Sequence, residues 1–360
     1  MTTTKPIIHI YGLFHTQTNQ KYSHCAFTGK VLRFSKMMRA QGYKIIEYSN
    51  EGCESNPDEH VTIFSKSEFD QFYKNRSEKE FHGNYARMDG EPHKLFEKKL
   101  IFEMYKRLEP TDFICHPFGI CHHNLLKFFP NNFHIESGIG YTETIPDTFK
   151  IFESYAWLHH QQGIDKRSGK NYEWVVPNYY DLDEWEPSYT PGKYIAFLGR
   201  ICKEKGMDII AEIANHSKCT IKICGQGDPT PWTHQNIIYG GPINGNARSE
   251  FLRNAKAVLM PTVFTEPFGG SGVEGMLCGT PLIAVDYGAF TETIIDGVTG
   301  FRCRTLKDWI EAIDNVEKLD RIKIAEIARS RYSLEACGKK YNKIFKDLSN
   351  LRKKGWYELE

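Results

Sequence analysis

Residues 257–285 read AVLMPTVFTEPFGGSGVEGMLCGTPLIAV, and this stretch decides the fold. The short apolar runs at 257–260 and 281–285 predict buried strands. Between them, glycines open a predicted helix at 272–277, and Gly279 supplies its C-terminal stop. Strand, glycine-rich turn, helix and strand in this order indicate a parallel sheet with helices on its faces.

The same alternation extends outward in both directions along the chain. Strands are expected at 7–11, 43–48, 112–115, 194–198 and 220–224, and helices at 30–41, 94–108, 207–215 and from 250–254 onward. Residues 50–93 are polar and predict only loops and short helices. The pattern as a whole is typical of an α/β protein.

The chain length of 360 residues favours two domains, because a typical domain contains roughly 150 residues. Val176-Pro177-Asn178 and the acidic, proline-flanked stretch 181–190 form a plausible hinge between the two halves. Two doubly wound, Rossmann-like domains would place a central cleft at the carboxyl ends of both sheets, where such folds bind ligands.

Composition excludes several classes of protein. Apolar residues make up 40% and charged residues 25%, and the formal net charge is +1, which disfavours a nucleic-acid coat protein. The ten cysteines are scattered without a CxxC pair, as suits a reducing compartment. The N-terminus lacks a signal-peptide pattern, and no apolar run approaches the ~18 residues of a membrane span. We therefore expect a cytoplasmic protein.

The glycine-rich loop at 261–275 carries the chemistry. Free N–H groups at a helix start favour an anion such as phosphate. Glu266 and Glu274, with seven residues between them, would repel a phosphate and should instead bind neutral hydroxyls, which a sugar nucleotide supplies. Two other interpretations stay open: Ser271-x-x-Glu274 is also the pattern of a helix capping box, and Glu266 alone could be a solvated loop acid.

At this point the sequence resembles the retaining glycosyltransferases of family four, which have the GT-B fold and an E-x7-E motif. Glu266–Glu274 matches that motif, and the resemblance is ordered from about residue 175 to 302. The flanking segments that agree are Val176-Pro177-Asn178…Asp181, YIAFLGRICKEKG at 194–206, and Asp286-Tyr287-Gly288…Glu292…Asp296-Gly297…Gly300. Before residue 175 the resemblance is weaker and rests on Thr28-Gly29-Lys30, Gly42-Tyr43 and Asp112…His116-Pro117.

The resemblance implies roles for the donor-side residues. Arg200 and Lys205 would neutralise the donor diphosphate, although either alone could be a solvated loop residue. Glu274 would hold the ribose hydroxyls and Glu266 those of the transferred sugar. Backbone amides around Gly269, Gly270 and Ser271 would complete the donor site. One departure is Gly275, where the family usually has Ala, and it suggests that the backbone comes close to something there.

For the first domain, the family supplies a histidine near the reacting carbon, and His116 is the candidate catalytic residue here. A hydrogen-bonded structural histidine is the alternative. The loop that follows the first strand is expected to meet the acceptor or the diphosphate. Its candidate residues are Gly12, His15, His24, Thr28 and Gly29, with a plain helix start as the alternative for Gly29.

No metal and no cofactor besides the donor are expected. His122 and His123 lie near Cys115 and Cys121, but these spacings fit no usual zinc pattern. The transfer is therefore expected to be metal-independent, with Arg200, Lys205 and helix amides stabilising the departing diphosphate.

The expected domains are 1–177 on the acceptor side, 178–335 on the nucleotide-sugar side, and a basic helix at 336–360 that packs back on the first domain. That helix could also be a solvated basic face, or could contact a membrane or a phosphorylated acceptor.

The expected function is retaining transfer of a sugar from a UDP- or GDP-linked donor to a hydroxyl acceptor, with a glycan or a lipid-linked sugar favoured. Transfer onto a modified nucleobase in DNA and a sugar-nucleotide epimerase or hydrolase are the alternatives, and a non-catalytic binder is disfavoured. An NAD enzyme is disfavoured because no G-x-G-x-x-G opens the first helix.

Overall fold

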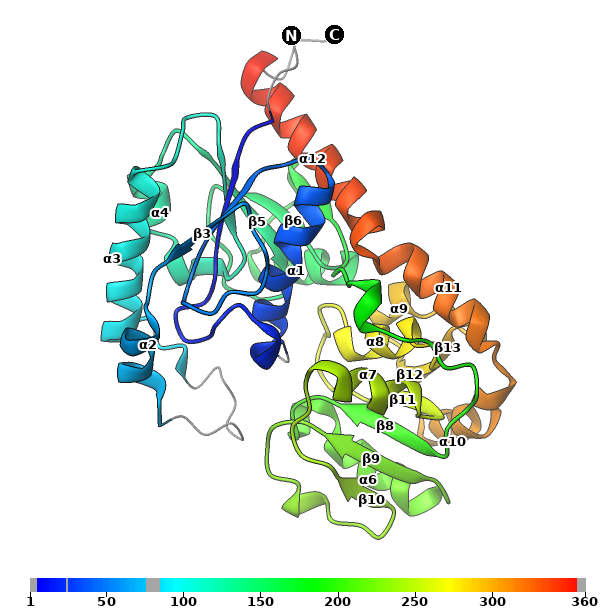
Figure 1. Cartoon of the computed structure of the whole chain (residues 1–360). Coiled ribbons are helices and arrows are strands. Elements are labelled where there is room, and N and C mark those ends of the chain that lie inside the picture. The colour runs from blue at the N-terminus through cyan, green and yellow to red at the C-terminus, as the bar shows by residue number, and fades with distance from the viewer. Residues whose placement is uncertain (1–4, 24, 76–84, 355–360) are drawn as a thin grey trace.

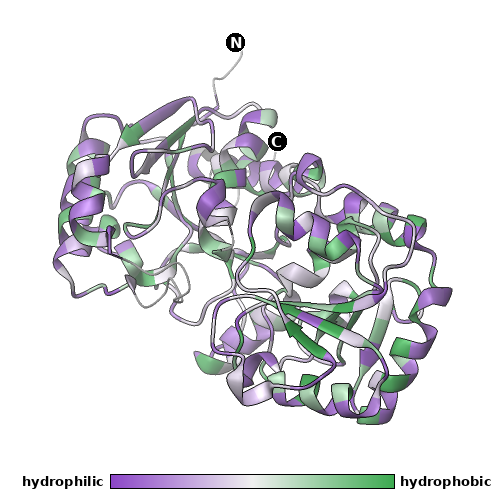
Figure 2. Cartoon of the chain, turned by 60° about the horizontal axis from the view of Figure 1, so that its bottom comes forward, coloured by the Kyte–Doolittle hydropathy of each residue, from purple (hydrophilic) through white to green (hydrophobic). Residues whose placement is uncertain are grey.

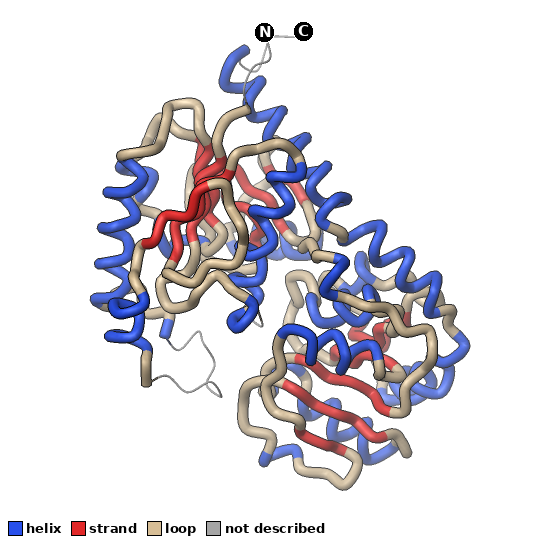
Figure 3. Tube along the Cα trace, in the orientation of Figure 1, coloured by secondary structure: helices blue, strands red, loops and turns tan. Residues whose placement is uncertain are grey.

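The computed structural model describes residues 5–23, 25–75 and 85–354. The chain forms two α/β domains, each built on one parallel sheet with helices on both faces (Figures 1 and 3). The two sheets contain seven and six strands, and every strand pair is parallel.

The N-terminal sheet has the order β3-β2-β1-β4-β5-β6-β7. Its strands are β1 (Ile8–Tyr11), β2 (Ile45–Ser49), β3 (Glu59–Thr62), β4 (Phe113–His116), β5 (Phe133–Ile139), β6 (Phe149–Phe152) and β7 (Glu173–Val175). Its helices are η1 (Gln20–Tyr22), α1 (Ala26–Ala40), α2 (Lys66–Tyr73), α3 (Glu91–Tyr105), η3 (Gly119–His122), α4 (Leu125–Phe128) and α5 (Tyr155–Ile164).

The C-terminal sheet has the order β10-β9-β8-β11-β12-β13. Its strands are β8 (Tyr194–Leu198), β9 (Thr220–Cys224), β10 (Ile237–Tyr239), β11 (Ala257–Met260), β12 (Leu282–Val285) and β13 (Gly300–Cys303). The short helix η4 (Leu182–Glu184) precedes this domain. The remaining helices are η5 (Lys203–Lys205), α6 (Met207–His216), η6 (Thr230–Trp232), α7 (Gly245–Arg253), α8 (Gly270–Leu277), α9 (Phe290–Thr293), α10 (Leu306–Asn315), η7 (Val316–Lys318), α11 (Arg321–Tyr332) and α12 (Leu334–Lys354).

Helix α12 crosses from the C-terminal domain back along the N-terminal domain, as expected from the sequence (Figure 1). It packs on α1, and its buried residues Tyr341, Phe345 and Leu348 belong to the same hydrophobic cluster as Ile8 and Val31. The return point is fixed by the backbone, because the Tyr180 amide donates to Tyr332 O at 2.8 Å and the Leu334 amide donates to Tyr180 O at 3.0 Å. The last helix is therefore structurally part of the first domain.

Buried apolar strands form the core of each domain, and in Figure 2 the strands of the C-terminal sheet are largely green. The cores on the two faces of the N-terminal sheet are separate clusters, one of which includes α12. Compared with the sequence expectation, the polar stretch 50–93 contains one more strand, β3, and a two-turn helix, α2. Ser65 caps α2 through a capping box with Glu68.

Candidate functional site

Each sheet has one point at which the strand order reverses, between β1 and β4 in the first domain and between β8 and β11 in the second. Ligands of doubly wound sheets bind beyond the carboxyl ends of the strands at this switch point. The expected donor residues all follow β8 or β11. Arg200 and Lys205 come after β8, the latter in η5, and Gly269 comes after β11, followed by Gly270, Ser271 and Glu274 in α8. The expected acceptor-side residues follow β1, with Thr28 and Gly29 already inside α1, and His116 is the last residue of β4.

Helix α8 begins at this switch point because Gly269 can adopt a left-handed conformation. Its φ is +82°, and a Cβ there would lie 2.5 Å from the ring of Phe290. A side chain at this position would therefore be both strained and in collision. The first N–H groups of α8 have no acceptor within the helix and point beyond its N-terminus, where an anion can accept hydrogen bonds from them.

The capping-box interpretation of Glu274 is excluded by the helix start. Gly269 is the N-cap of α8, so Ser271 lies inside the first turn, and its hydroxyl contacts the Met260 sulfur at 3.7 Å. The Glu274 carboxylate instead forms an ion pair with Arg248 of α7. Both side chains are largely buried, at 7% and 13% exposure. Such a pair keeps a charged carboxylate at a fixed position beside the loop.

Glu266 is paired in the same manner. Lys205, the last residue of η5, donates to its carboxylate at 2.7 Å, and the Lys205 ammonium also lies 4.8 Å from the ring centroid of Phe264. The structure thus brings Lys205 and Glu266 together across the switch point. Arg200 lies at the start of the same β8 loop, on the exposed side.

Gly275 is explained by packing of α8 on the sheet. A Cβ at this position would lie 2.4 Å from Cγ2 of Val258 in β11. The close approach expected from the sequence therefore exists, and its partner is the central strand beneath the helix.

Arg33 of the first domain and Tyr180 at the start of the second domain also lie near Glu274. Arg33 of α1 lies 5.0 Å from the ring centroid of Tyr180, and the Tyr180 hydroxyl donates to Gly270 O at 3.3 Å. Burial alone would lower the pKa of Arg33, but the carboxylates of Glu184 and Glu274 more than offset this effect, and its pKa is raised. The Arg33 guanidinium forms its ion pair with Glu184 at 3.2 Å, and Glu274 acts on it through space.

The loops beyond the carboxyl ends of the two sheets contact each other directly. Ser154, after β6, donates to Pro267 O at 2.6 Å, within the loop that carries Glu266. Glu292 of α9 accepts the first amides of α5, those of Tyr155 and Ala156, at 2.9 and 2.7 Å. The second domain thus caps a helix of the first domain next to the expected donor site.

The loop that follows β1 is fixed by hydrogen bonds from Asn50, the residue directly after β2. Asn50 donates to the carbonyl oxygens of Leu13, Phe14 and Thr16. Thr28 shares a hydrogen bond of 2.8 Å with Thr16. Of the expected residues here, Gly12, His15, Thr28 and Gly29 are buried, and His24 lies outside the described residues. Helix α1 starts at Ala26, so Gly29 lies within its first turns. Whether this loop meets an acceptor stays a prediction.

His116 is fully buried in a chain of hydrogen bonds. His134 must donate from Nε2, because its partner at 2.9 Å is the Phe129 carbonyl oxygen. Its Nδ1 then accepts from His116 Nε2 at 2.8 Å, and His116 Nδ1 accepts from the Tyr11 hydroxyl at 2.8 Å. Burial lowers the pKa of His116 well below its ordinary value, and the neighbouring His134 lowers it further. His116 is therefore a neutral ring whose two nitrogens are both engaged.

Replacing His116 with Phe is expected to lower the free energy of unfolding by about 1–3 kcal/mol, because the buried Tyr11 hydroxyl and His134 Nδ1 lose their partner. Chemical denaturation measures this change. A catalytic role at the reacting carbon predicts the opposite pattern, a large loss of turnover with unchanged stability. Measuring both quantities on one variant separates the two interpretations.

Sequence reasoning missed three residues of distant elements around the site: the cations Arg33 and Arg248, and the hydroxyl of Ser154. Arg248 and Glu274 are separated by 26 residues and meet only because α7 packs on α8. Glu292 was part of the recognised pattern, but its contact with α5 is a property of the two-domain arrangement and has no local signal.

A family of known proteins matches most of the second domain in sequence. The family described as "Glycosyl transferases group 1" matches residues 192–318. The glycogen synthase of Mycobacterium tuberculosis is 28% identical over 148 residues, which is 36% of this chain and 35% of that protein. The curated relatives that this chain matches first are covered over about a third of their length.

Solved structures match the whole chain. Sucrose-phosphate synthase from Thermosynechococcus elongatus has a TM-score of 0.66 and 14% identity, with 96% of this chain and 99% of that chain covered. HepE of Anabaena, solved in complex with UDP-glucose, has the same TM-score, identity and coverage. The chain therefore has the GT-B fold of glycosyltransferase structures. Among the residues that the structure describes, no helix is both long and apolar enough to span a membrane.

Proposed function

We propose that this chain is a retaining glycosyltransferase that moves a sugar from a nucleoside-diphosphate sugar to a hydroxyl acceptor. One observation carries the proposal: two buried carboxylates, Glu266 and Glu274, flank the start of α8, and each is paired with a cation from another element. This arrangement lies at the switch point of the domain that matches the glycosyl transferases.

Each residue then has a role that suits its chemistry. Lys205 and Arg200 attract the diphosphate, and amides near Gly269, Gly270 and Ser271 donate to it. Glu274, held by Arg248, accepts hydrogen bonds from the ribose hydroxyls. Glu266 accepts hydrogen bonds from the transferred sugar when the diphosphate draws Lys205 away. Charge stabilisation of the leaving diphosphate is the main contribution to rate, and it requires no metal ion at this site.

A UDP-linked donor is favoured because HepE, which shares the fold, was solved with UDP-glucose. For the acceptor we favour a glycan or glycoconjugate. The basic helix α12 gives little support to a membrane or nucleic-acid acceptor, since Lys339 and Lys343 form ion pairs with Glu335 and Asp347 on the same helix.

The direct test is a donor panel. The protein is incubated with UDP- and GDP-linked sugars, with and without glycan acceptors, and released nucleoside diphosphate is measured. Acceptor-dependent release from one donor, with an α-linked product from an α-linked donor, supports the proposal. Conversion of donor alone to an epimer or to free sugar, without stimulation by any acceptor, supports the epimerase or hydrolase instead.

A further inference from the structure

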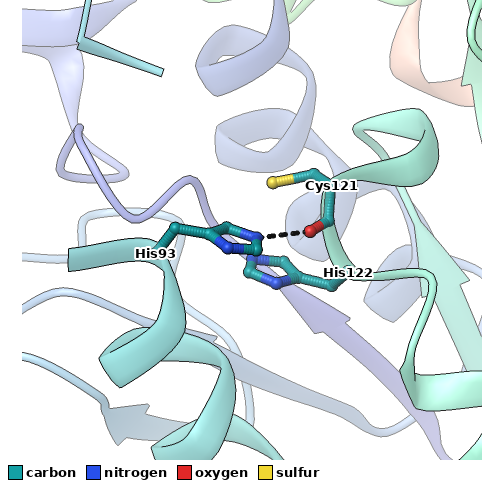
Figure 4. Close-up of side chains that lie close together, drawn as sticks. All are labelled: His93, Cys121 and His122. Carbon is teal, nitrogen blue, oxygen red and sulfur yellow. Dashed lines mark hydrogen bonds between the residues drawn. The ribbon is translucent and has the colours of Figure 1, made fainter. Parts of the chain in front are cut away.

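A second group of reactive side chains lies in the first domain, apart from the residues assigned to the donor. His93 comes from the first turn of α3, and Cys121 and His122 come from η3 (Figure 4). Each offers one ligand atom, and these atoms all lie within 4.8 Å of one another. All three residues are buried, at 6%, 6% and 0% exposure. The sequence could not reveal this group because His93 is 28 residues away from Cys121.

The orientation of His93 is fixed by the backbone. Its Nε2 lies 2.5 Å from the carbonyl oxygen of Cys121, shown as the dashed line in Figure 4. A carbonyl oxygen only accepts, so Nε2 carries the proton and Nδ1 carries a lone pair. Nδ1 is buried and has no hydrogen-bond partner among the residues that the structure describes.

His122 lies beside a carboxylate. Oε1 of Glu97 lies 3.4 Å from His122 Nδ1, within ion-pair distance, but neither atom has a hydrogen-bond partner among the described residues. Within the described part of the chain, Nε2 is buried without a hydrogen-bond partner. The second oxygen of Glu97 accepts from Asn124 at 3.0 Å, which holds this carboxylate in place.

Both histidines therefore show the pattern of metal ligands. A metal-binding imidazole almost always donates its other N–H to a carboxylate or a backbone carbonyl. Here the Cys121 carbonyl takes this position for His93, and Glu97 lies beside Nδ1 of His122 at ion-pair distance. Two buried lone pairs beside a thiol, without partners, are costly in the apolar surroundings that Phe14 and Phe96 provide. A bound cation would satisfy all three groups at once.

We propose that His93 Nδ1, Cys121 Sγ and His122 Nε2 bind a zinc ion. Two imidazoles and one thiolate are the ligand types that zinc prefers, and a water molecule takes the fourth tetrahedral position. Binding displaces the thiol proton of Cys121 to solvent. Ligand atoms around zinc lie about 3.5 Å apart, so the observed separations of up to 4.8 Å must shorten on binding. The rings of His93 and His122, which stack with centroids 4.9 Å apart and planes 4° apart, must also tilt toward the ion.

The position of the ion indicates its role. It joins the start of α3 to η3, which follows directly after β4. Phe14 of the first loop packs against His93 with ring centroids 5.2 Å apart, and Tyr11 packs against His122 at 5.1 Å. The ion therefore stabilises the packing of α3 and η3 against Tyr11 and Phe14, at the start of the first loop. This structural role is separate from the proposed transfer reaction.

The test is metal content and cobalt spectroscopy of the tag-free, full-length protein. Protein expressed with added zinc is expected to contain roughly one zinc per chain. Protein stripped with a chelator and loaded with Co²⁺ is expected to show the visible bands of a tetrahedral site together with a thiolate-to-cobalt charge-transfer band. Cys121→Ser should remove the charge-transfer band, and His122→Gln should lower the zinc content at least tenfold.

The matched control is Cys115→Ser, which removes another buried thiol from the same domain and should leave zinc content and the cobalt spectrum unchanged. If Cys121→Ser does not fold, the cobalt spectrum of the wild-type protein alone still decides whether a thiolate binds the metal. Wild-type protein that takes up neither ion overturns the proposal. So does a variant pair, Cys121→Ser and His122→Gln, that folds and keeps the wild-type metal content.

Discussion

Replacing Lys205 with Ala is expected to lower kcat about 10²–10³-fold, with a smaller change in KM for the donor. A single cationic group aimed at a leaving diphosphate stabilises the charge that develops in the transition state, and the loss of one such donor typically has this effect. Lys205 is the residue that lies at hydrogen-bond distance from Glu266, so it can pass from that carboxylate to the diphosphate when the donor binds. Steady-state kinetics with the donor identified by the panel measures both constants.

The control for this prediction is Lys203→Ala, because Lys203 belongs to the same short helix η5, carries the same charge and is exposed. It should retain wild-type kcat. Lys205→Arg keeps the charge and should recover part of the rate. The melting temperature of each variant separates a catalytic loss from a loss of folding, since Lys205→Ala also leaves Glu266 unpaired. Wild-type turnover in folded Lys205→Ala would remove Lys205 from the reaction.

The centre of the C-terminal domain was largely predictable from sequence because strands β8, β11 and β12 are almost completely buried. β8, β9 and β11 read as short runs of apolar residues, and the structure gives them the expected bounds. The helices α6 and α8 also follow the expectation to within two residues, since Gly206 and Gly269 mark their starts.

About half of the strands in the N-terminal sheet were not predicted, because their sequences are not short apolar runs. β5 contains His134, Glu136 and Ser137, and a run with these residues does not read as a buried strand. The fold tolerates Glu136 because Lys150 of β6, together with Thr148 and the Ile145 amide, supplies donors to its carboxylate. These partners come from outside the strand, so local sequence could not show that the charge is satisfied.

The candidate donor site also contains residues that the sequence predicted and residues that only the fold revealed. Glu266 and Glu274 were found in one contiguous pattern after β11, and Lys205 was found in a second pattern after β8. The ion-pair partner of Glu274 was not found, because Arg248 reaches it only through the packing of α7 on α8. The zinc ligands depend on the same kind of distant pairing. Sequence therefore identified the groups that we propose to act, and only the fold shows which groups lie against them.

Replacing Glu274 with Gln is expected to raise the Kd for the donor nucleotide about 10–100-fold. Hydrogen bonds to a charged acceptor contribute about 1.5–3 kcal/mol, and the change keeps the volume and one oxygen acceptor for Arg248. The loss should lie mainly in affinity, because ribose hydroxyls are bound equally in the ground state and the transition state. Isothermal titration calorimetry with the free nucleoside diphosphate measures it.

Variants of Arg248, the ion-pair partner of Glu274, test whether Glu274 must be held in place to bind the nucleotide. If Arg248 acts by holding Glu274, then Arg248→Gln should weaken nucleotide binding by itself, and the double variant Arg248→Gln/Glu274→Gln should bind no more weakly than Glu274→Gln. Glu250→Gln, an exposed change on the same helix α7, serves as the control and should leave the Kd unchanged. Equal Kd values for Glu274→Gln and Glu250→Gln would show that the Glu274 carboxylate does not bind the nucleotide. Additive losses in the double variant would show instead that Arg248 contacts the nucleotide independently of Glu274.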